Sequence, residues 1–242
     1  MRDHPVDDPI YAPGTLYSQV AADRVAKTLA LIDARRPGAI LDVGFYPGTL
    51  GTIIRDHGYG GRLDGLGLLN GRTAAEFSPT YQAIHDQELD PFYGSVGVED
   101  LGKEYDLILA LEIVEHLIDP RPLYRLIRRN LAPGGIALMS TPNVSSLGAI
   151  GRLIKGRSNY EALGRSVMAF QNDWRAHVRL YDRAELIELG RMHGLEVVEH
   201  AYYTSSALRH EARKGVNWML RNLASALMPR YREDQVILYR PI

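Results

Sequence analysis

The chain of 242 residues contains no cysteine, which excludes disulfide bonds, thiolate metal sites and cysteine nucleophiles. It also lacks an excess of charge of either sign, because 28 Lys and Arg residues stand against 29 Asp and Glu residues. A chain with a net charge of −1 is not built to wrap a polyanion. We therefore expect no nucleic-acid partner.

Long hydrophobic runs are missing as well. No apolar stretch approaches the roughly 20 residues that a membrane-spanning helix needs. The first residues, Met1–Pro13, are polar and interrupted by proline, unlike a secretion signal. We expect a cytoplasmic protein without an integral membrane segment.

What the chain does contain is an ordinary globular composition, with 45% hydrophobic and 24% charged residues. Its length suits one domain with a full core. We predict a single domain over residues 1–242, preceded by a loose arm at 1–14. Residues 143–178 are long, irregular and dotted with aromatic and basic residues, which is typical of a lid or acceptor-binding insertion.

Short apolar runs alternate with amphipathic segments along most of the chain. The runs predict seven strands, at residues 39–43, 62–69, 94–98, 105–111, 136–140, 195–201 and 235–239. The amphipathic segments predict helices at residues 16–35, 49–55, 122–131, 183–193 and 207–228. This alternation indicates an α/β fold, a doubly wound and mostly parallel sheet with helices on both faces.

The most informative stretch follows the first predicted strand, where Asp42 and Gly44 precede Pro47 and Gly48. A glycine turn between a strand and a helix lets the backbone approach a ligand closely, and the carboxylate of Asp42 suits an amine or a positive charge. The dinucleotide fingerprint G-x-G-x-x-G does not fit, because Tyr46 occupies the second glycine position. A nicotinamide-dependent oxidoreductase is therefore disfavoured.

Four motifs in order resemble class I S-adenosylmethionine-dependent methyltransferases, over roughly residues 20–240. They are Leu41-Asp42-Val43-Gly44-x-x-Pro47-Gly48, the run Tyr105–Leu117, the segment Leu131–Asn143, and His177-Val178-Arg179-Leu180-Tyr181 before a capped helix. The resemblance implies a Rossmann-like methyltransferase fold with an antiparallel last strand, and S-adenosyl-L-methionine as cofactor. It also implies methyl transfer to a small-molecule acceptor, most of all to a hydroxyl oxygen of a sugar, glycolipid precursor or natural product.

The resemblance also implies which residues contact the cofactor. Asp42 corresponds to the position that meets the amino group of the cofactor, and Glu99 or Asp100 to the one that accepts the adenine amine. The full expected set is Asp42, Gly44, Tyr46, Gly48, Glu99, Asp100, Leu111, Glu112 and Ile113. For Glu99 and Asp100, a solvated loop acid is the alternative.

Two positions depart from the family pattern. Tyr46 replaces the middle glycine of the first motif, and it either packs against the cofactor or plugs the site. Gly67 stands where an acid usually binds the ribose hydroxyls. These departures keep open a non-catalytic binding module that retains the methyltransferase fold.

Two histidines are candidate bases for an oxygen acceptor. His177 follows the predicted lid, and His116 follows the fourth strand, where a structural histidine bound to loop backbone is the alternative. No cluster of His, Asp and Glu has metal-ligand spacing in the sequence, so we predict no metal. The basic face of residues 207–228 is compatible with weak association with a membrane surface. The sequence also does not decide whether the protein is a homodimer, or whether it methylates oxygen, nitrogen or carbon.

Overall fold

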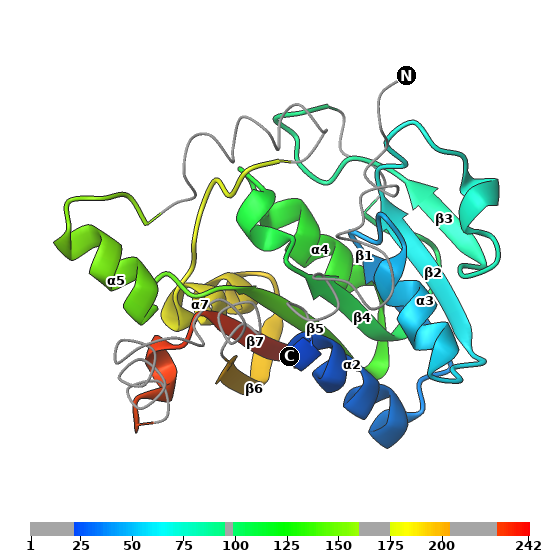
Figure 1. The fold of residues 1–242 in the computed structure, drawn as a ribbon. Helices are drawn as coiled ribbons and strands as arrows, with labels where there is room; N and C mark the ends of the chain where they lie inside the picture. The colour runs from blue at the N-terminus through cyan, green and yellow to red at the C-terminus, as the bar shows by residue number, and fades with distance from the viewer. Residues whose placement is uncertain (1–21, 95–98, 160–174, 204–226) are drawn as a thin grey trace.

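The computed structural model of the chain describes residues 22–94, 99–159, 175–203 and 227–242. Its centre is a seven-stranded sheet in the order β3-β2-β1-β4-β5-β7-β6 (Figure 1). The strands are β1 Ala39–Val43, β2 Arg62–Gly67, β3 Ala83–Asp86, β4 Tyr105–Leu111, β5 Leu131–Pro142, β6 Leu195–Tyr203 and β7 Asp234–Pro241.

The strands β3, β2, β1, β4 and β5 run parallel, whereas β7 pairs antiparallel with both β5 and β6. This confirms the predicted mostly parallel sheet with an antiparallel last strand. Because β1 lies between β2 and β4, the strand order reverses beside β1. Open α/β sheets bind ligands at the carboxyl ends of the strands at such a switch point.

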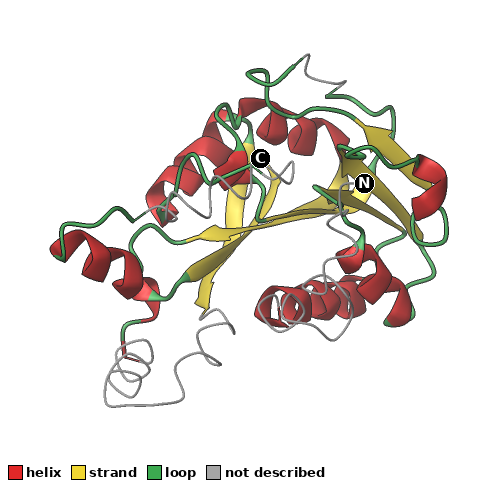
Figure 2. Cartoon of the chain, turned by 45° about the horizontal axis from the view of Figure 1, so that its top comes forward, coloured by secondary structure: helices red, strands yellow, loops and turns green. Residues whose placement is uncertain are grey.

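Helices cover both faces of the sheet (Figure 2). They are α2 Ala22–Arg35, α3 Thr49–Asp56, α4 Arg121–Asn130, α5 Leu147–Ile154 and α7 Arg183–Met192, with 3₁₀ turns η2 Ala74–Phe77, η3 Val114–His116 and η4 Pro229–Tyr231. Ile32 of α2 and Ile54 of α3 belong to the core on one face, and Leu126 of α4 and Leu186 of α7 to the core on the other. In the described part of the chain, every helix is too short or too polar to span a bilayer.

Strand β4 shows why the sequence folds into two cores. Leu107 and Leu109 point into the core of α2 and α3, while Ile108 and Ala110 point into the core of α4 and α7. Side chains alternate between the faces of a strand, so a run that is apolar throughout must be buried on both. The predicted bounds of this strand and of β1 are confirmed.

The helix α7 begins as the sequence predicts. The side chain of Asp182 accepts a hydrogen bond from the backbone of Glu185 at 2.9 Å, and the side chain of Glu185 accepts one from the backbone of Asp182 at 2.9 Å. This capping box satisfies amide groups that the first turn of a helix leaves without partners. It fixes where the chain turns after residues 175–181.

Several predicted elements differ from the structure. Strand β5 spans Leu131–Pro142 and begins five residues before its predicted start. Strand β2 ends at Gly67, two residues early. The third strand is Ala83–Asp86, and most of the predicted one, residues 95–98, lies outside the described residues. The predicted insertion at 143–178 contains the helix α5. The described residues leave out 1–21, 160–174 and 204–226, and with them the predicted arm and most of the predicted basic helix.

We expect Gly190→Ala in α7 to lower the free energy of unfolding by about 1–3 kcal/mol, because overpacking a core is costly. A Cβ at Gly190 would lie 2.5 Å from Cε1 of Tyr239. Tyr239 is fully buried, and its hydroxyl donates to the carbonyl of Leu186 at 2.8 Å, so the ring has little freedom to move. Urea unfolding followed by circular dichroism measures the change.

The matched control is Gly151→Ala in α5, where a Cβ meets no atom within 4 Å. An alanine there replaces a helical glycine without a clash, so we expect a gain of about 0.5–1 kcal/mol. Equal losses of stability in both variants would contradict the packing explanation.

Candidate functional site

The turn between β1 and α3 is shaped by two glycines. Gly44 has φ +77° and Gly48 has φ +95°, backbone conformations that favour glycine. The amide of Gly44 donates to the carbonyl of Leu66 at 2.7 Å, which joins the end of β1 to the end of β2. Gly48 is the residue from which α3 begins. The turn therefore leaves the start of the helix open to a ligand.

Gly44 also touches the end of β4. A Cβ at Gly44 would lie 1.9 Å from Cδ1 of Ile113. A larger residue would have to displace the Ile113 side chain, and the structure thus brings the predicted residues Gly44 and Ile113 together.

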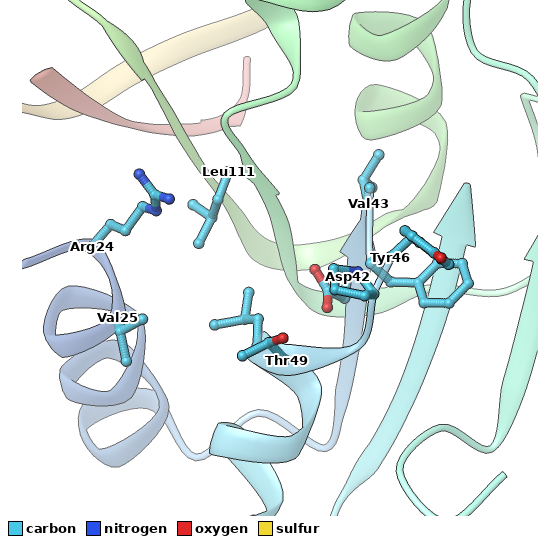
Figure 3. A pocket seen from close by; sticks show the side chains of 11 residues that line it. Arg24, Val25, Asp42, Val43, Tyr46, Thr49 and Leu111 are labelled. Carbon is cyan, nitrogen blue, oxygen red and sulfur yellow. The ribbon is translucent and has the colours of Figure 1, made fainter. Parts of the chain in front are cut away.

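A pocket opens beside this turn (Figure 3). Its lining comes from α2, the end of β1, the turn, the start of α3 and the end of β4, and consists of Arg24, Val25, Asp42, Val43, Gly44, Phe45, Tyr46, Pro47, Thr49, Leu50 and Leu111. Arg24 reaches in from α2 on one side and Asp42 lies at the end of β1 on the other. The pocket thus carries one cationic and one acidic side chain.

Asp42 is the buried acid of the pocket, with 3% of its surface exposed. The hydroxyl of Tyr81 donates to its Oδ2 at 2.7 Å. Burial raises the pKa of Asp42 to about 7, although the hydrogen bond from Tyr81 opposes the shift. A cationic ligand group beside the carboxylate would favour its ionised form.

Arg24 and Glu112 meet at the opposite wall. Nη1 of Arg24 lies 3.4 Å from Oε2 of Glu112, and the hydroxyl of Ser140 donates to Oε1 of Glu112 at 2.7 Å. Glu112 has φ +57°, an uncommon backbone conformation for a residue with a side chain. The end of β4 is therefore bent so that Leu111 lines the pocket while Glu112 turns toward Arg24.

Tyr46 does not plug the space between Arg24 and Asp42. Its ring packs edge-on against Phe77 of η2, with ring centroids 6.3 Å apart. Figure 3 shows the ring on the side of β1 away from Arg24. Tyr46 forms part of the pocket wall.

A second group of polar side chains follows β4. Glu115 is fully buried in η3, and the hydroxyl of Thr141 donates to its Oε2 at 3.0 Å. The rings of His116 and His177 lie edge to face with centroids 4.8 Å apart, and Nε2 of His116 lies 3.9 Å from Oε1 of Glu115. The structure thus joins the two predicted histidines, which are 61 residues apart in the sequence.

Burial controls the protonation of this group. It raises the pKa of Glu115 well above its ordinary value, and the charge of Glu112 adds to the shift. It lowers the pKa of His116 to about 4, with a further contribution from His177. At neutral pH the His116 imidazole is therefore uncharged and a weak proton acceptor.

The same three residues are also the place where a metal ion could be held. Glu115, His116 and His177 each offer one ligand atom, and these atoms lie within 4.8 Å of one another. One carboxylate and two imidazoles are a ligand set that Zn²⁺ and Fe²⁺ accept. The sequence predicts no metal site, and its spacing gave no sign of this one because His177 comes from a distant segment.

The observed third strand β3 ends at Asp86, so Glu99 and Asp100 lie well beyond it along the chain. Glu99 forms ion pairs with Arg125 at 2.7 Å and Arg129 at 3.2 Å, both on α4. The carboxylate of Asp100 accepts the amide of Gly102 at 2.8 Å. Both acids thus have structural partners outside the pocket lining.

The sequence did not single out Arg24, which lines the pocket, or Tyr81, which contacts Asp42, and it did not single out Asp86. Asp86 lies beside Gly67 in the register of β2 and β3, and its Oδ1 accepts the amide of Leu69 at 3.0 Å. The short and polar strand β3 gave little signal, and Arg24 sits inside an ordinary amphipathic helix. Their roles depend on which strands and helices pack together.

Comparison with known proteins places this arrangement in context. Residues 16–200 match the family described as "Methyltransferase domain". The ubiquinone biosynthesis O-methyltransferase of Thiobacillus denitrificans is 26% identical over 203 residues, which cover 79% of this chain and 82% of that protein.

Two solved structures share the fold. The PH0226 protein from Pyrococcus horikoshii OT3 superposes with a TM-score of 0.58 at 16% identity, covering 97% of this chain and 96% of that one. Magnesium protoporphyrin IX methyltransferase from Synechocystis PCC 6803 with bound SAH gives a TM-score of 0.53 at 13% identity, covering 95% and 90%. The predicted Rossmann-like methyltransferase fold is confirmed.

We expect the carboxyl group of Asp42 to titrate with a midpoint near pH 7, because burial disfavours its charged form. Tyr81→Phe removes the hydrogen bond that stabilises the ionised form, so the midpoint should move to higher pH. Carbon-13 NMR of labelled aspartate measures both, with Asp42→Asn identifying the signal. A midpoint near pH 4 in the wild type would contradict the burial of this carboxyl.

Proposed function

Because this chain belongs to the methyltransferase-domain family, we propose that it transfers a methyl group to a hydroxyl oxygen of a small-molecule acceptor. Family membership makes it an S-adenosylmethionine-dependent methyltransferase, with S-adenosyl-L-methionine as the cofactor. The acceptor and the methylated atom are the parts that we propose.

The amino-acid end of the cofactor suits the two charged walls of the pocket. It carries an ammonium and a carboxylate, and the pocket offers the carboxylate of Asp42 and the guanidinium of Arg24. Opposite charges at both ends orient a zwitterion in one direction. We assign Asp42 to the amino group and Arg24 to the carboxylate, with Gly44 and Gly48 giving the backbone access and Leu111 an apolar wall.

The adenosine end belongs at the carboxyl ends of β2 and β3. Gly67 supplies no side chain there, but Asp86 ends the adjacent strand in register with it. We propose that Asp86 supplies the carboxylate that Gly67 lacks. Its exposed position leaves one oxygen to accept hydroxyl or amino groups of the adenosine.

Methyl transfer from a sulfonium is a displacement that depends mostly on alignment. An oxygen acceptor also needs a group that takes its proton. The observation that supports the proposal is the contact of His177 with His116, a residue that follows β4 five positions after Leu111 of the pocket wall. Because His116 is a weak acceptor, we assign the base to His177 and the positioning of its ring to His116.

The acceptor that we propose is a sugar, a glycolipid precursor or a natural product that bears a hydroxyl group. A relative named as an O-methyltransferase supports oxygen as the methylated atom. A hydroxyl acceptor usually needs a general base, which an imidazole can supply, whereas many nitrogen acceptors are nucleophilic without one.

We expect micromolar binding of S-adenosylmethionine and S-adenosylhomocysteine by calorimetry, and none of a nicotinamide dinucleotide. Affinity for S-adenosylhomocysteine should rise at least about tenfold between pH 5.5 and 7.5, because its ammonium binds the ionised form of Asp42 and the pKa of that carboxyl is about 7. Asp42→Asn should bind more weakly at pH 7.5 and lose this slope. A slope that persists in Asp42→Asn would assign the titration to another group.

We expect His177→Ala to lower kcat about 10²–10⁴-fold, the usual contribution of a general base. Binding of S-adenosylhomocysteine should stay unchanged, because His177 is not part of the pocket lining. The assay follows S-adenosylhomocysteine formation with a panel of hydroxylated acceptors. The control is His57→Ala, which removes an exposed histidine paired with Asp33. Full activity of His177→Ala would overturn the assignment of the base.

A further inference from the structure

The segment that carries His177 is joined to the loop after β3 by Arg175. Nη1 of Arg175 donates to Oε1 of Glu88 at 2.9 Å, and Nη2 contacts Oε2, so the pair is bidentate. The guanidinium also lies over the ring of Tyr93, with Cζ 3.8 Å from the ring centroid. Arg175 is thus held by both a carboxylate and an aromatic face, the two partners that a planar guanidinium fits best.

Glu88 is itself fixed in its loop. Its Oε1 accepts the amides of Leu89 and Asp90, each at 2.8 Å. Burial raises the pKa of Glu88, but the bonds from Arg175 and from these amides outweigh it, so the pKa lies below its ordinary value. Glu88 is therefore a charged and oriented anchor.

Asp90 extends this anchor toward the histidines. It is fully buried, and its Oδ2 accepts the amide of Ile118 at 2.5 Å. Ile118 lies two residues after His116. The loop after β3 is therefore tied both to the turn that follows η3 and to the segment that carries His177.

His177 lies between two attachment points. On one side is Arg175, two residues earlier; on the other, the amide of Val178 donates to the carbonyl of Glu115 at 2.8 Å. The ring of His177 rests on His116 between them. Because the backbone of His177 is held on both sides, its ring loses little conformational entropy when a substrate binds.

We propose that Arg175 is a positioning residue, which through Glu88 fixes His177 relative to the cofactor-binding ends of β2 and β3. This rests on the proposed function, in which His177 is the base. Glu88 lies two residues after Asp86, and the amide of Gln87 donates to the carbonyl of Gly67 at 3.3 Å. A ligand at the end of β2 would therefore be linked to His177 by the Gly67–Gln87 hydrogen bond, by Glu88, and by the Glu88–Arg175 pair.

A second arginine on the same segment provides the contrast. Arg179 lies two residues after His177 and pairs with Glu185 of α7, but 59% of its side chain is exposed, against 22% for Arg175. Exposed ion pairs contribute little to the energy of a fold, whereas a bidentate and partly buried pair is stronger. Arg179→Ala is thus a matched control for Arg175→Ala.

The first test measures hydrogen exchange at the amide of Val178 by NMR, without ligand. We expect exchange to be about tenfold faster in Arg175→Ala and in Glu88→Ala, and unchanged in Arg179→Ala. Combining Arg175→Ala with Glu88→Ala should give clearly less than the sum of the two single effects, because both changes break the Arg175–Glu88 pair. Arg175→Lys keeps the charge but not the bidentate contact, so we expect a partial recovery.

The second test adds S-adenosylhomocysteine to the intact protein. Saturation with S-adenosylhomocysteine should slow hydrogen exchange at the Val178 amide in the wild type and in Arg179→Ala, but not in Arg175→Ala. The affinity for S-adenosylhomocysteine, measured by calorimetry, should stay within about twofold in all three proteins. For any acceptor that the wild type methylates, Arg175→Ala should lower kcat about a hundredfold, as expected for a misplaced catalytic group, with little change in the KM of the cofactor.

Wild-type exchange rates at Val178 in Arg175→Ala, or additive effects in the double variant, would overturn the proposal. Failure of the wild type to bind S-adenosylhomocysteine would instead overturn the proposed cofactor site. The ligand-free comparison of the variants would still decide the role of Arg175, so the two failures are distinguishable.

Discussion

The contact of Gly44 with its neighbours is the constraint on which the site depends. Its amide binds the carbonyl of Leu66 at the end of β2, its φ of +77° favours glycine, and a Cβ would collide with the side chain of Ile113 after β4. Three strand ends therefore meet at one residue without a Cβ. Because they meet, the chain can turn beside Asp42 and present both the start of α3 and the wall at Leu111 to one ligand.

Three buried carboxyl groups differ in the direction of their pKa shifts because they have different neighbours. Asp64, in β2, contacts Arg62 and accepts the hydroxyl of Tyr105 at 2.7 Å; although burial raises its pKa, these partners hold the pKa below the ordinary range. Asp42 and Glu115 accept hydrogen bonds from the neutral hydroxyls of Tyr81 and Thr141, and their pKa values are raised. A buried acid that is not matched by a cation in contact is costly, which is why Asp42 and Glu115 are the carboxyl groups that we assign to or near the proposed site.

Much of the architecture could be predicted, since local patterns carry it. The strands β1 and β4 are mostly apolar runs, and α7 starts at a capping box, so their positions follow from a few adjacent residues. Strand β3 could not be found in this way, because it is a four-residue edge strand whose side chains are half-buried or exposed. Of the site, the turn at Gly44 and the end of β4 were found from motifs, while Arg24, Tyr81 and Asp86 were not.

The sequence by itself determined the parallel sheet, the glycine turn with its acid and the two histidines, because periodicity and turn chemistry act over a few residues. Only the tertiary structure decided what these parts do together. It placed His177 on His116, joined Arg175 to Glu88 across 87 residues, and set Asp86 beside Gly67. Such contacts depend on which strands are neighbours in the sheet and how the loops pack, and no local pattern of the chain encodes a contact between segments that are far apart in the sequence.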